Sequence, residues 1–180
     1  SSLKNKAPIS IGQQVWQNGR LIKLNISNSN ISYIPKNIGQ LKQLKLLSLY
    51  SNKIDKLPQS IENLINLKEL LINDNNIVDF SINLDKLSKL TSLHIHNNQI
   101  EKINNGICSL KLNKNNLNSF LAGNNRLCDN LDLCIEKFLG LDYSSNNNDI
   151  VYSPQNCINC NEKKYGIENT NDQDILDKNQ

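Results

Sequence analysis

Two histidines, His94 and His96, are the side chains in this sequence best suited to bind a metal ion or to respond to pH. They lie two positions apart, so on an extended strand both imidazole rings point to the same face. Zinc or copper would need further ligands, and Asp74 and Asn73 are only weakly placed to supply them. We therefore predict no metal site. A pH-sensitive contact is the favoured interpretation, because histidine titrates near neutrality.

Five cysteines form the second group of reactive side chains: Cys108, Cys128, Cys134, Cys157 and Cys160. Four thiols would be enough for a zinc site, and free thiols are another interpretation. Because the cysteines cluster late in the chain and have no catalytic partner, we favour disulfides formed in an oxidising compartment.

No residue pattern indicates catalysis. No serine or cysteine has a paired base and orienting acid, and a chain with seven glycines shows no glycine-rich phosphate loop. We predict that the protein is not an enzyme and uses no cofactor. A formal net charge of +3, with both signs interspersed along the chain, makes no case for nucleic acid binding. No apolar run approaches the length of a membrane helix, so we expect no membrane insertion.

An internal repeat organises most of the chain. The segment 44–64, LKLLSLYSNKIDKLPQSIENL, recurs with a 23-residue period. The coils begin at Leu21, Leu44, Leu67, Leu90 and Leu117. Starting a strand directly at Cys108 would give a 17-residue fourth coil, which is too short for such a repeat. Aligning Ile107–Leu110 with Ile61–Leu64 instead gives a 27-residue fourth coil with a polar insertion.

The LxxLxL segments, the following asparagine and the LPxxIxxL second half resemble the leucine-rich repeat family over about residues 21–141. The variant is similar to the 23-residue type, and the late cysteines are similar to the C-terminal cap of secreted bacterial members. The resemblance implies an α/β fold, namely a short horseshoe-shaped solenoid. Its concave face would be a parallel β-sheet, and its convex segments would be irregular or short helices.

Four parts follow from this alignment. We expect residues 1–20 to form an N-terminal cap, with Ile9, Ile11, Val15 and Trp16 facing the core. Residues 21–141 form about five repeats, 142–160 a cysteine-containing C-terminal cap and 161–180 a polar tail or linker.

Alignment of the last two coils also suggests a disulfide pattern. It places Cys108 near Cys134 on the convex side, so this pair is the first choice. Cys128 would then pair with Cys157 and leave Cys160 free, whereas the alternative pairs Cys134 with Cys160.

Two surfaces are distinguished by the repeat. A column of asparagines follows the strands, and we interpret it as structural, because an amide supplies both a donor and an acceptor to the bends. The column comprises Asn52, Asn75, Asn98 and Asn125. The outward residues of the strands are the candidate ligand-binding set: Leu46, Ser48, Tyr50, Glu69, Leu71, Asn73, His94, His96 and Leu121. Aromatic and apolar side chains among small polar neighbours are typical of interface anchors, although scattered exposed apolar residues are also ordinary.

Together these patterns predict a non-catalytic recognition module that binds a protein, or a glycan, on its concave face. The clustered cysteines favour an extracellular or cell-surface location over the cytoplasm. The sequence has no methionine, so we expect that a leader was removed or that the chain is a fragment. The alternatives are a structural subunit that self-associates into a surface layer or larger assembly, and a cytosolic signalling scaffold.

Overall fold

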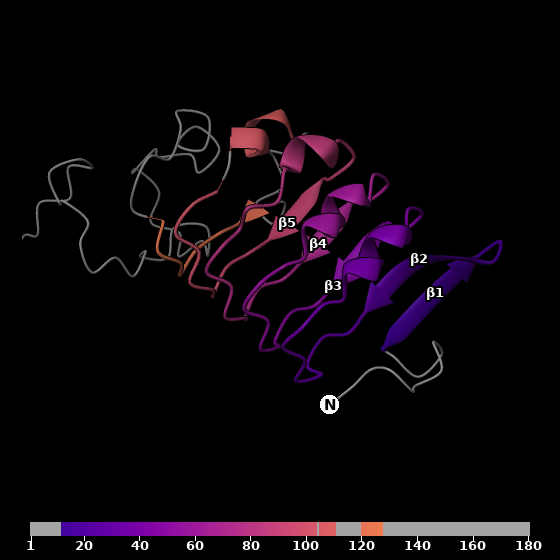
Figure 1. Ribbon diagram of the computed structural model, residues 1–180, viewed down its shortest axis with the longest axis horizontal. Coiled ribbons are helices and arrows are strands. Elements are labelled where there is room, and N and C mark those ends of the chain that lie inside the picture. The colour runs from indigo at the N-terminus through magenta and orange to yellow at the C-terminus, as the bar shows by residue number, and fades with distance from the viewer. Residues whose placement is uncertain (1–11, 104, 111–119, 128–180) are drawn as a thin grey trace, which may run out of the picture.

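The computed structural model describes residues 12–103, 105–110 and 120–127, and these form a stack of coils (Figure 1). The strands are β1 (Gln13–Gln17), β2 (Arg20–Asn25), β3 (Leu46–Ser48), β4 (Glu69–Leu71), β5 (Ser92–His94) and β6 (Phe120–Leu121). The 3-10 helices are η3 (Lys36–Gln40), η4 (Gln59–Asn63), η5 (Leu84–Lys86) and η6 (Asn105–Ser109). The strands form one sheet in sequence order, and Figure 1 shows them in one row with the helices in another.

The register of the sheet shows how the coils repeat. From β2 to β6 the strands are parallel, and Leu24, Leu47, Leu70 and Leu93 are successive partners, each one repeat period after the last. Phe120 pairs with Leu93, which requires a longer fourth coil than the others. The expected 27-residue fourth coil is therefore confirmed, and the parallel solenoid predicted from the repeat is the observed fold.

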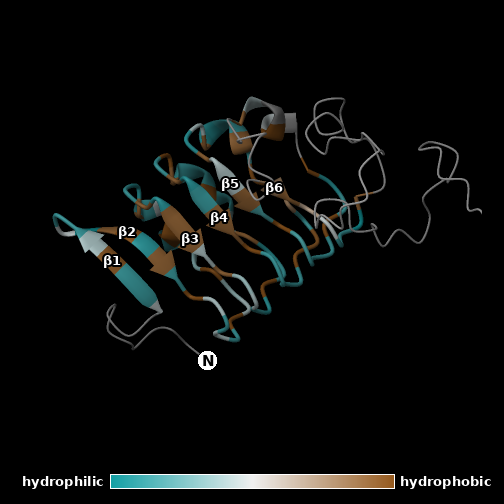
Figure 2. Ribbon diagram, turned by 180° about the vertical axis from the view of Figure 1, so that it is seen from behind, coloured by the Kyte–Doolittle hydropathy of each residue, from teal (hydrophilic) through white to brown (hydrophobic). Residues whose placement is uncertain are grey.

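The core lies between the sheet and the helices. Alternation along each short strand turns one side chain inward, and the columns of leucine and isoleucine fill every described coil. Leu44, Leu47, Leu49 and Ile54 of the second coil have no exposed surface. Figure 2 shows the same alternation of apolar and polar colour in successive coils. Because each coil covers its neighbour, no coil buries its apolar face alone.

The convex side is held by short helices that pack closely. Pro35 and Pro58 have extended backbone (φ near −70°) and lead into η3 and η4. Gly39 on η3 is buried against η4, and a Cβ at this position would lie 2.5 Å from the carbonyl oxygen of Ser60. The absence of a side chain therefore lets the two helices approach each other.

The N-terminal edge differs from the expected cap. Strand β1 pairs antiparallel with β2 and covers its edge, with Val15 opposite Lys23 and a bulge before Trp16. Val15 is 47% exposed and Trp16 52% exposed, so the prediction that both face the core is wrong. Val15 is exposed because of this pairing. Directly opposed residues share a face of the sheet, and Lys23, opposite Val15, points outward.

Some expectations concern residues outside the described ranges, namely Ile9, Ile11, Leu117, Cys128, Cys134, Cys157, Cys160 and the segment 142–180. Cys108 lies on η6, and Leu110 donates its N–H to the Ile107 carbonyl as Leu64 does to Ile61. This matches the alignment of the two convex segments. Among the described residues, no helix is long and apolar enough to span a bilayer.

Candidate functional site

The concave sheet brings the outward strand residues together in three rows that cross the coils. The first row contains Lys23, Leu46, Glu69 and Ser92, and the second contains Asn25, Ser48, Leu71, His94 and Leu121. Tyr50, Asn73 and His96 form the third row, where backbone hydrogen bonds continue past the strand ends. Neighbouring strands are about 4.8 Å apart, so side chains in adjacent rows and coils lie within contact range.

Exposure divides the nine candidate binding residues. Seven are half-buried, namely Leu46, Tyr50, Glu69, Leu71, Asn73, His94 and His96. Ser48 is 2% exposed and Leu121 is 8% exposed, so the expectation that they present area to a partner is wrong for both. Ser48 is a small side chain between larger neighbours, and its hydroxyl forms a 2.8 Å hydrogen bond with the hydroxyl of Ser27.

The two histidines lie side by side in the fourth coil, His94 at the end of β5 and His96 two residues after it. Their ring centroids are 6.0 Å apart and the rings are tilted by 54°. His94 Nε2 is 3.4 Å from the hydroxyl of Ser92. Within the described part of the chain, His96 Nδ1 is the one buried side-chain nitrogen or oxygen that has no hydrogen-bond partner. This unmade hydrogen bond costs free energy in the unbound protein.

The surroundings of His96 favour its neutral form. Burial is the largest effect and lowers the pKa of His96 below its usual 6.5. The carboxylate of Asp74 acts in the opposite direction, and the neighbouring His94 lowers the pKa further. His96 is therefore uncharged at neutral pH and resists protonation as the pH falls.

The carboxylate that could have joined the histidines is engaged elsewhere. Asp74 Oδ1 accepts a 2.6 Å hydrogen bond from Asn97 Nδ2, and Asp74 Oδ2 accepts one of 2.6 Å from Asn73 Nδ2. No group of three or more His, Cys, Asp or Glu side chains is placed to hold a metal ion among the residues that the structure describes. None of those residues gives the histidine pair a third ligand.

The asparagine column forms a buried hydrogen-bond ladder behind the concave face. Asn75 Nδ2 donates to the carbonyl of Ile72 in its own coil and to that of Leu49 in the preceding coil, each at 3.0 Å. Its Oδ1 accepts the N–H of Ile54 at 3.0 Å. The same pattern recurs at the other three positions, Asn52, Asn98 and Asn125. These amides satisfy buried backbone groups of two coils at once.

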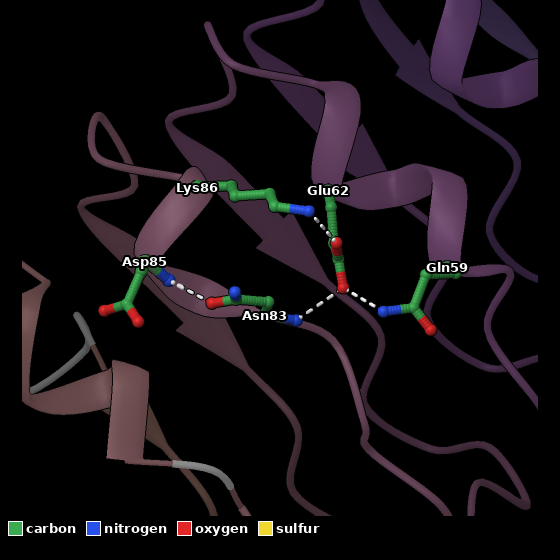
Figure 3. Close-up of polar contacts among 5 residues, drawn as sticks. All are labelled: Gln59, Glu62, Asn83, Asp85 and Lys86. Atoms are coloured by element: carbon green, nitrogen blue, oxygen red, sulfur yellow. Dashed lines mark hydrogen bonds and ion pairs between the residues drawn. The ribbon is translucent and has the colours of Figure 1, made fainter.

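A second polar cluster, on the convex side, was not found from the sequence (Figure 3). Glu62 on η4 is 4% exposed. Its carboxylate accepts hydrogen bonds from Gln59 Nε2, from the N–H of Asn83 at 2.8 Å and from Lys86 Nζ at 2.7 Å. The last is also an ion pair that joins the second coil to the third. Asn83 caps η5 by accepting the N–H of Asp85 at 3.0 Å.

These partners decide the ionisation of Glu62. Burial, the largest single effect, raises the pKa of this carboxyl, but the hydrogen bond from Lys86 and the N–H of Asn83 lower it, as do the charge of Lys86 and the amide of Gln59. The lowering effects together outweigh burial, so the pKa of Glu62 lies below its usual 4.5. A carboxylate with all these donors links neighbouring coils and is not available as a general base. The sequence feature that could have indicated this ion pair is the position of Lys86, one coil and one residue after Glu62.

Comparison with known proteins agrees with this architecture. Residues 11–139 match the sequence profile of a leucine-rich repeat region. The fold is similar to that of an internalin from Listeria monocytogenes, with a TM-score of 0.53 and 28% identity, covering 66% of this chain and 32% of the internalin chain. A leucine-rich repeat protein from Leptospira interrogans gives a TM-score of 0.50 and 27% identity, covering 58% of this chain and 32% of that one.

The chain thus matches about a third of the length of each of these two structures. No curated protein matches the sequence significantly. The repeat profile covers most of the chain, the asparagine ladder recurs in four successive coils, and the sheet is parallel from β2 onward. The protein belongs to the leucine-rich repeat family.

Proposed function

We propose that the protein is a non-catalytic module that binds a protein partner through an anchor patch on its concave face. The anchor patch comprises Leu46, Tyr50, Leu71, His94 and His96. The observation that carries this proposal is that apolar and aromatic side chains, all half-buried, occupy adjoining rows of one sheet face. Such side chains already lose part of their freedom in the unbound state, which favours binding.

The surroundings of the anchor patch suit a protein better than a small molecule. Charged side chains border the patch, with Lys23 and Glu69 in the first row, and Asn73 lies between Tyr50 and His96 in the third row. An apolar centre with a polar rim is the usual arrangement of protein interfaces. The similarity to an internalin and to a second leucine-rich repeat protein supports a recognition role, although this chain spans only part of their length.

The test compares single substitutions on and off the patch. The purified chain captures proteins from a cell-surface extract, and the retained protein is identified and its affinity measured by calorimetry. Leu71→Asp is expected to weaken binding at least about a hundredfold, because it places a charge in an apolar contact. Tyr50→Ala is expected to weaken it about tenfold.

The matched control is Val78→Asp, which introduces the same charge at an apolar side chain, 42% exposed, outside the strands. It should leave the affinity unchanged. Equal affinity of Leu71→Asp, Tyr50→Ala and the unsubstituted chain, with all three folded by circular dichroism, would place binding elsewhere. Retention of only a second copy of this chain would instead support the self-associating subunit.

We further propose that the chain is a secreted or cell-surface protein of the 23-residue repeat type whose late cysteines close a C-terminal cap. The support is their number and position after residue 107. Mass spectrometry of a non-reduced digest should show at least one disulfide that includes Cys108. Five alkylated thiols in protein isolated from its source would contradict the extracellular assignment.

A further inference from the structure

One edge of the solenoid carries a group of four exposed lysines. The three equivalent segments that lead from a convex helix into the next strand are Lys42–Lys45, Ile65–Lys68 and Ser88–Thr91. They contain four lysines and no acidic residue: Lys42, Lys45, Lys68 and Lys89. We refer to these four as the lysine edge. All four side chains are exposed.

Backbone hydrogen bonds stack these segments directly. The N–H of Lys68 donates to the carbonyl of Lys45 at 2.8 Å, and the N–H of Thr91 donates to that of Lys68 at 2.8 Å. Asn66 joins the other two lysines, donating to the Lys42 carbonyl at 2.8 Å and accepting from Lys89 Nζ at 2.6 Å. The lysine edge is therefore one continuous surface at the coil spacing of about 4.8 Å.

The lysines of this edge form no ion pair with a carboxylate in the part of the chain that the structure describes. Within the ranges that the structure describes, the ion pair is that of Lys86 with Glu62, on the convex side, and no member of the lysine edge takes part in one. The side chain that Lys89 contacts is a neutral amide. Like charges on stacked, neighbouring segments create a positive potential that attracts anions over about a Debye length.

The opposite edge of the solenoid has a different character. There the chain leaves the asparagine column, and Asp55, Asp79 and Glu101 alternate with Lys56 and Lys102. The two signs that are interspersed along the sequence are therefore partly separated by the fold. An excess of positive charge at one edge only gives an approaching partner a preferred orientation.

We propose that the lysine edge binds an acidic segment of a protein, which lies across the three segments Lys42–Lys45, Ile65–Lys68 and Ser88–Thr91. The positive surface calls for an anionic partner, and lysine ammonium groups act as adaptable point charges without the fixed geometry that arginine imposes. The edge borders the row of Leu46 and Glu69, so a protein on the concave face can reach it. The choice of a protein over an anionic polysaccharide rests on the proposed function. The prediction that the partner is anionic rests only on the charge of the lysine edge.

The test measures fluorescence anisotropy of a labelled deca-glutamate peptide with the full chain at low ionic strength. The double variant Lys45→Gln/Lys68→Gln is expected to bind roughly tenfold more weakly. The matched control Lys53→Gln/Lys56→Gln removes the same charge from two exposed lysines of the opposite edge and should change the affinity less than about twofold. Added salt should weaken binding to the unsubstituted chain more than to the double variant.

Equal weakening in the two double variants, with unchanged melting temperatures, would mean that net charge alone acts, and would overturn the proposal. A sulfated oligosaccharide that binds the edge while the peptide does not would also overturn it in favour of a glycan. Tyr50→Ala should bind the peptide like the unsubstituted chain. A negative result for the proposed anchor patch and a negative result for the proposed lysine edge thus come from separate experiments.

Discussion

The convex cluster around Glu62 and the concave histidine pair are two regions in which an ionisable side chain is withdrawn from water. Burial favours the neutral form in both. On the convex side, Lys86 and the neighbouring donors reverse that effect, and Glu62 is held ionised. On the concave side, Asp74 does not reverse it, and His96 Nδ1 has no hydrogen-bond partner among the residues that the structure describes.

The difference separates stability from recognition. Glu62 joins two coils, and its partners compensate its desolvation within the fold. His96 lies in a surface row beside the half-buried Asn73, and among the described residues its Nδ1 has no hydrogen-bond partner. Binding surfaces commonly retain groups that the unbound protein does not fully satisfy. The convex side is accordingly where substitutions should cost most stability, and the concave side is where they should cost least.

Among these substitutions, replacing Lys86 should lower the free energy of unfolding most. Lys86→Met keeps the aliphatic stem but leaves the Glu62 carboxylate buried without its cation, and we expect a loss of about 2 kcal/mol in the free energy of unfolding at pH 7. The expected value is below that of a fully buried pair, because the Lys86 side chain is 55% exposed. Urea unfolding followed by circular dichroism measures it, with Lys56→Met as the matched control.

The same variant should change the response to acid. In the unsubstituted chain the pKa of Glu62 lies below 4.5, so its contribution to stability is present above pH 4.5 and is lost as the pH falls through the folded-state pKa. Without Lys86, burial becomes the dominant effect and raises that pKa, so acid should cost less stability. Parallel pH profiles for the two proteins would show that Lys86 does not set the ionisation of Glu62.

A tighter test of convex packing is Gly39→Ala. The added Cβ would lie 2.5 Å from the Ser60 carbonyl oxygen, and we expect a loss of about 1 kcal/mol because backbone has little freedom to move away. The control Gln40→Ala changes an exposed residue of the same helix. Thermal unfolding of both should show a lower midpoint for Gly39→Ala alone. Equal midpoints would indicate that η3 and η4 are less closely packed than the structure shows.

The repeat made the fold predictable from the sequence. Its constant period determines which leucines become strand partners, because every coil must place equivalent positions beside each other. The length of the fourth coil followed from aligning Ile107 with Ile61, and the pairing of Phe120 with Leu93 confirms it. An asparagine recurs at the bends because its side-chain amide can donate to and accept from backbone groups of two coils.

The site was less predictable because burial depends on neighbours that the period does not identify. Alternation correctly placed Ser48 on the outward face, but adjacent coils bury it. Val15 was assigned to the core as an apolar residue, whereas antiparallel pairing with Lys23 turns it outward. Glu62 occupies the column of Gly39 and Asp85, and nothing in the sequence of that column distinguishes the buried carboxylate of Glu62 from the exposed one of Asp85.

The smallest expected effect is on the concave side, at His96. Because burial lowers its folded-state pKa below 6.5, the unfolded chain binds the proton more readily, and stability should fall as the pH drops through 6.5. His96→Gln should remove this loss, which we expect to be about 0.5 kcal/mol or less for a partly exposed group. His94→Gln is the matched control, since it removes an imidazole of the same pair and retains the one that is desolvated. Urea unfolding across this pH range should give a flatter profile for His96→Gln than for His94→Gln. Identical slopes in the two variants would mean that the desolvation of His96 contributes nothing to the difference between the two faces.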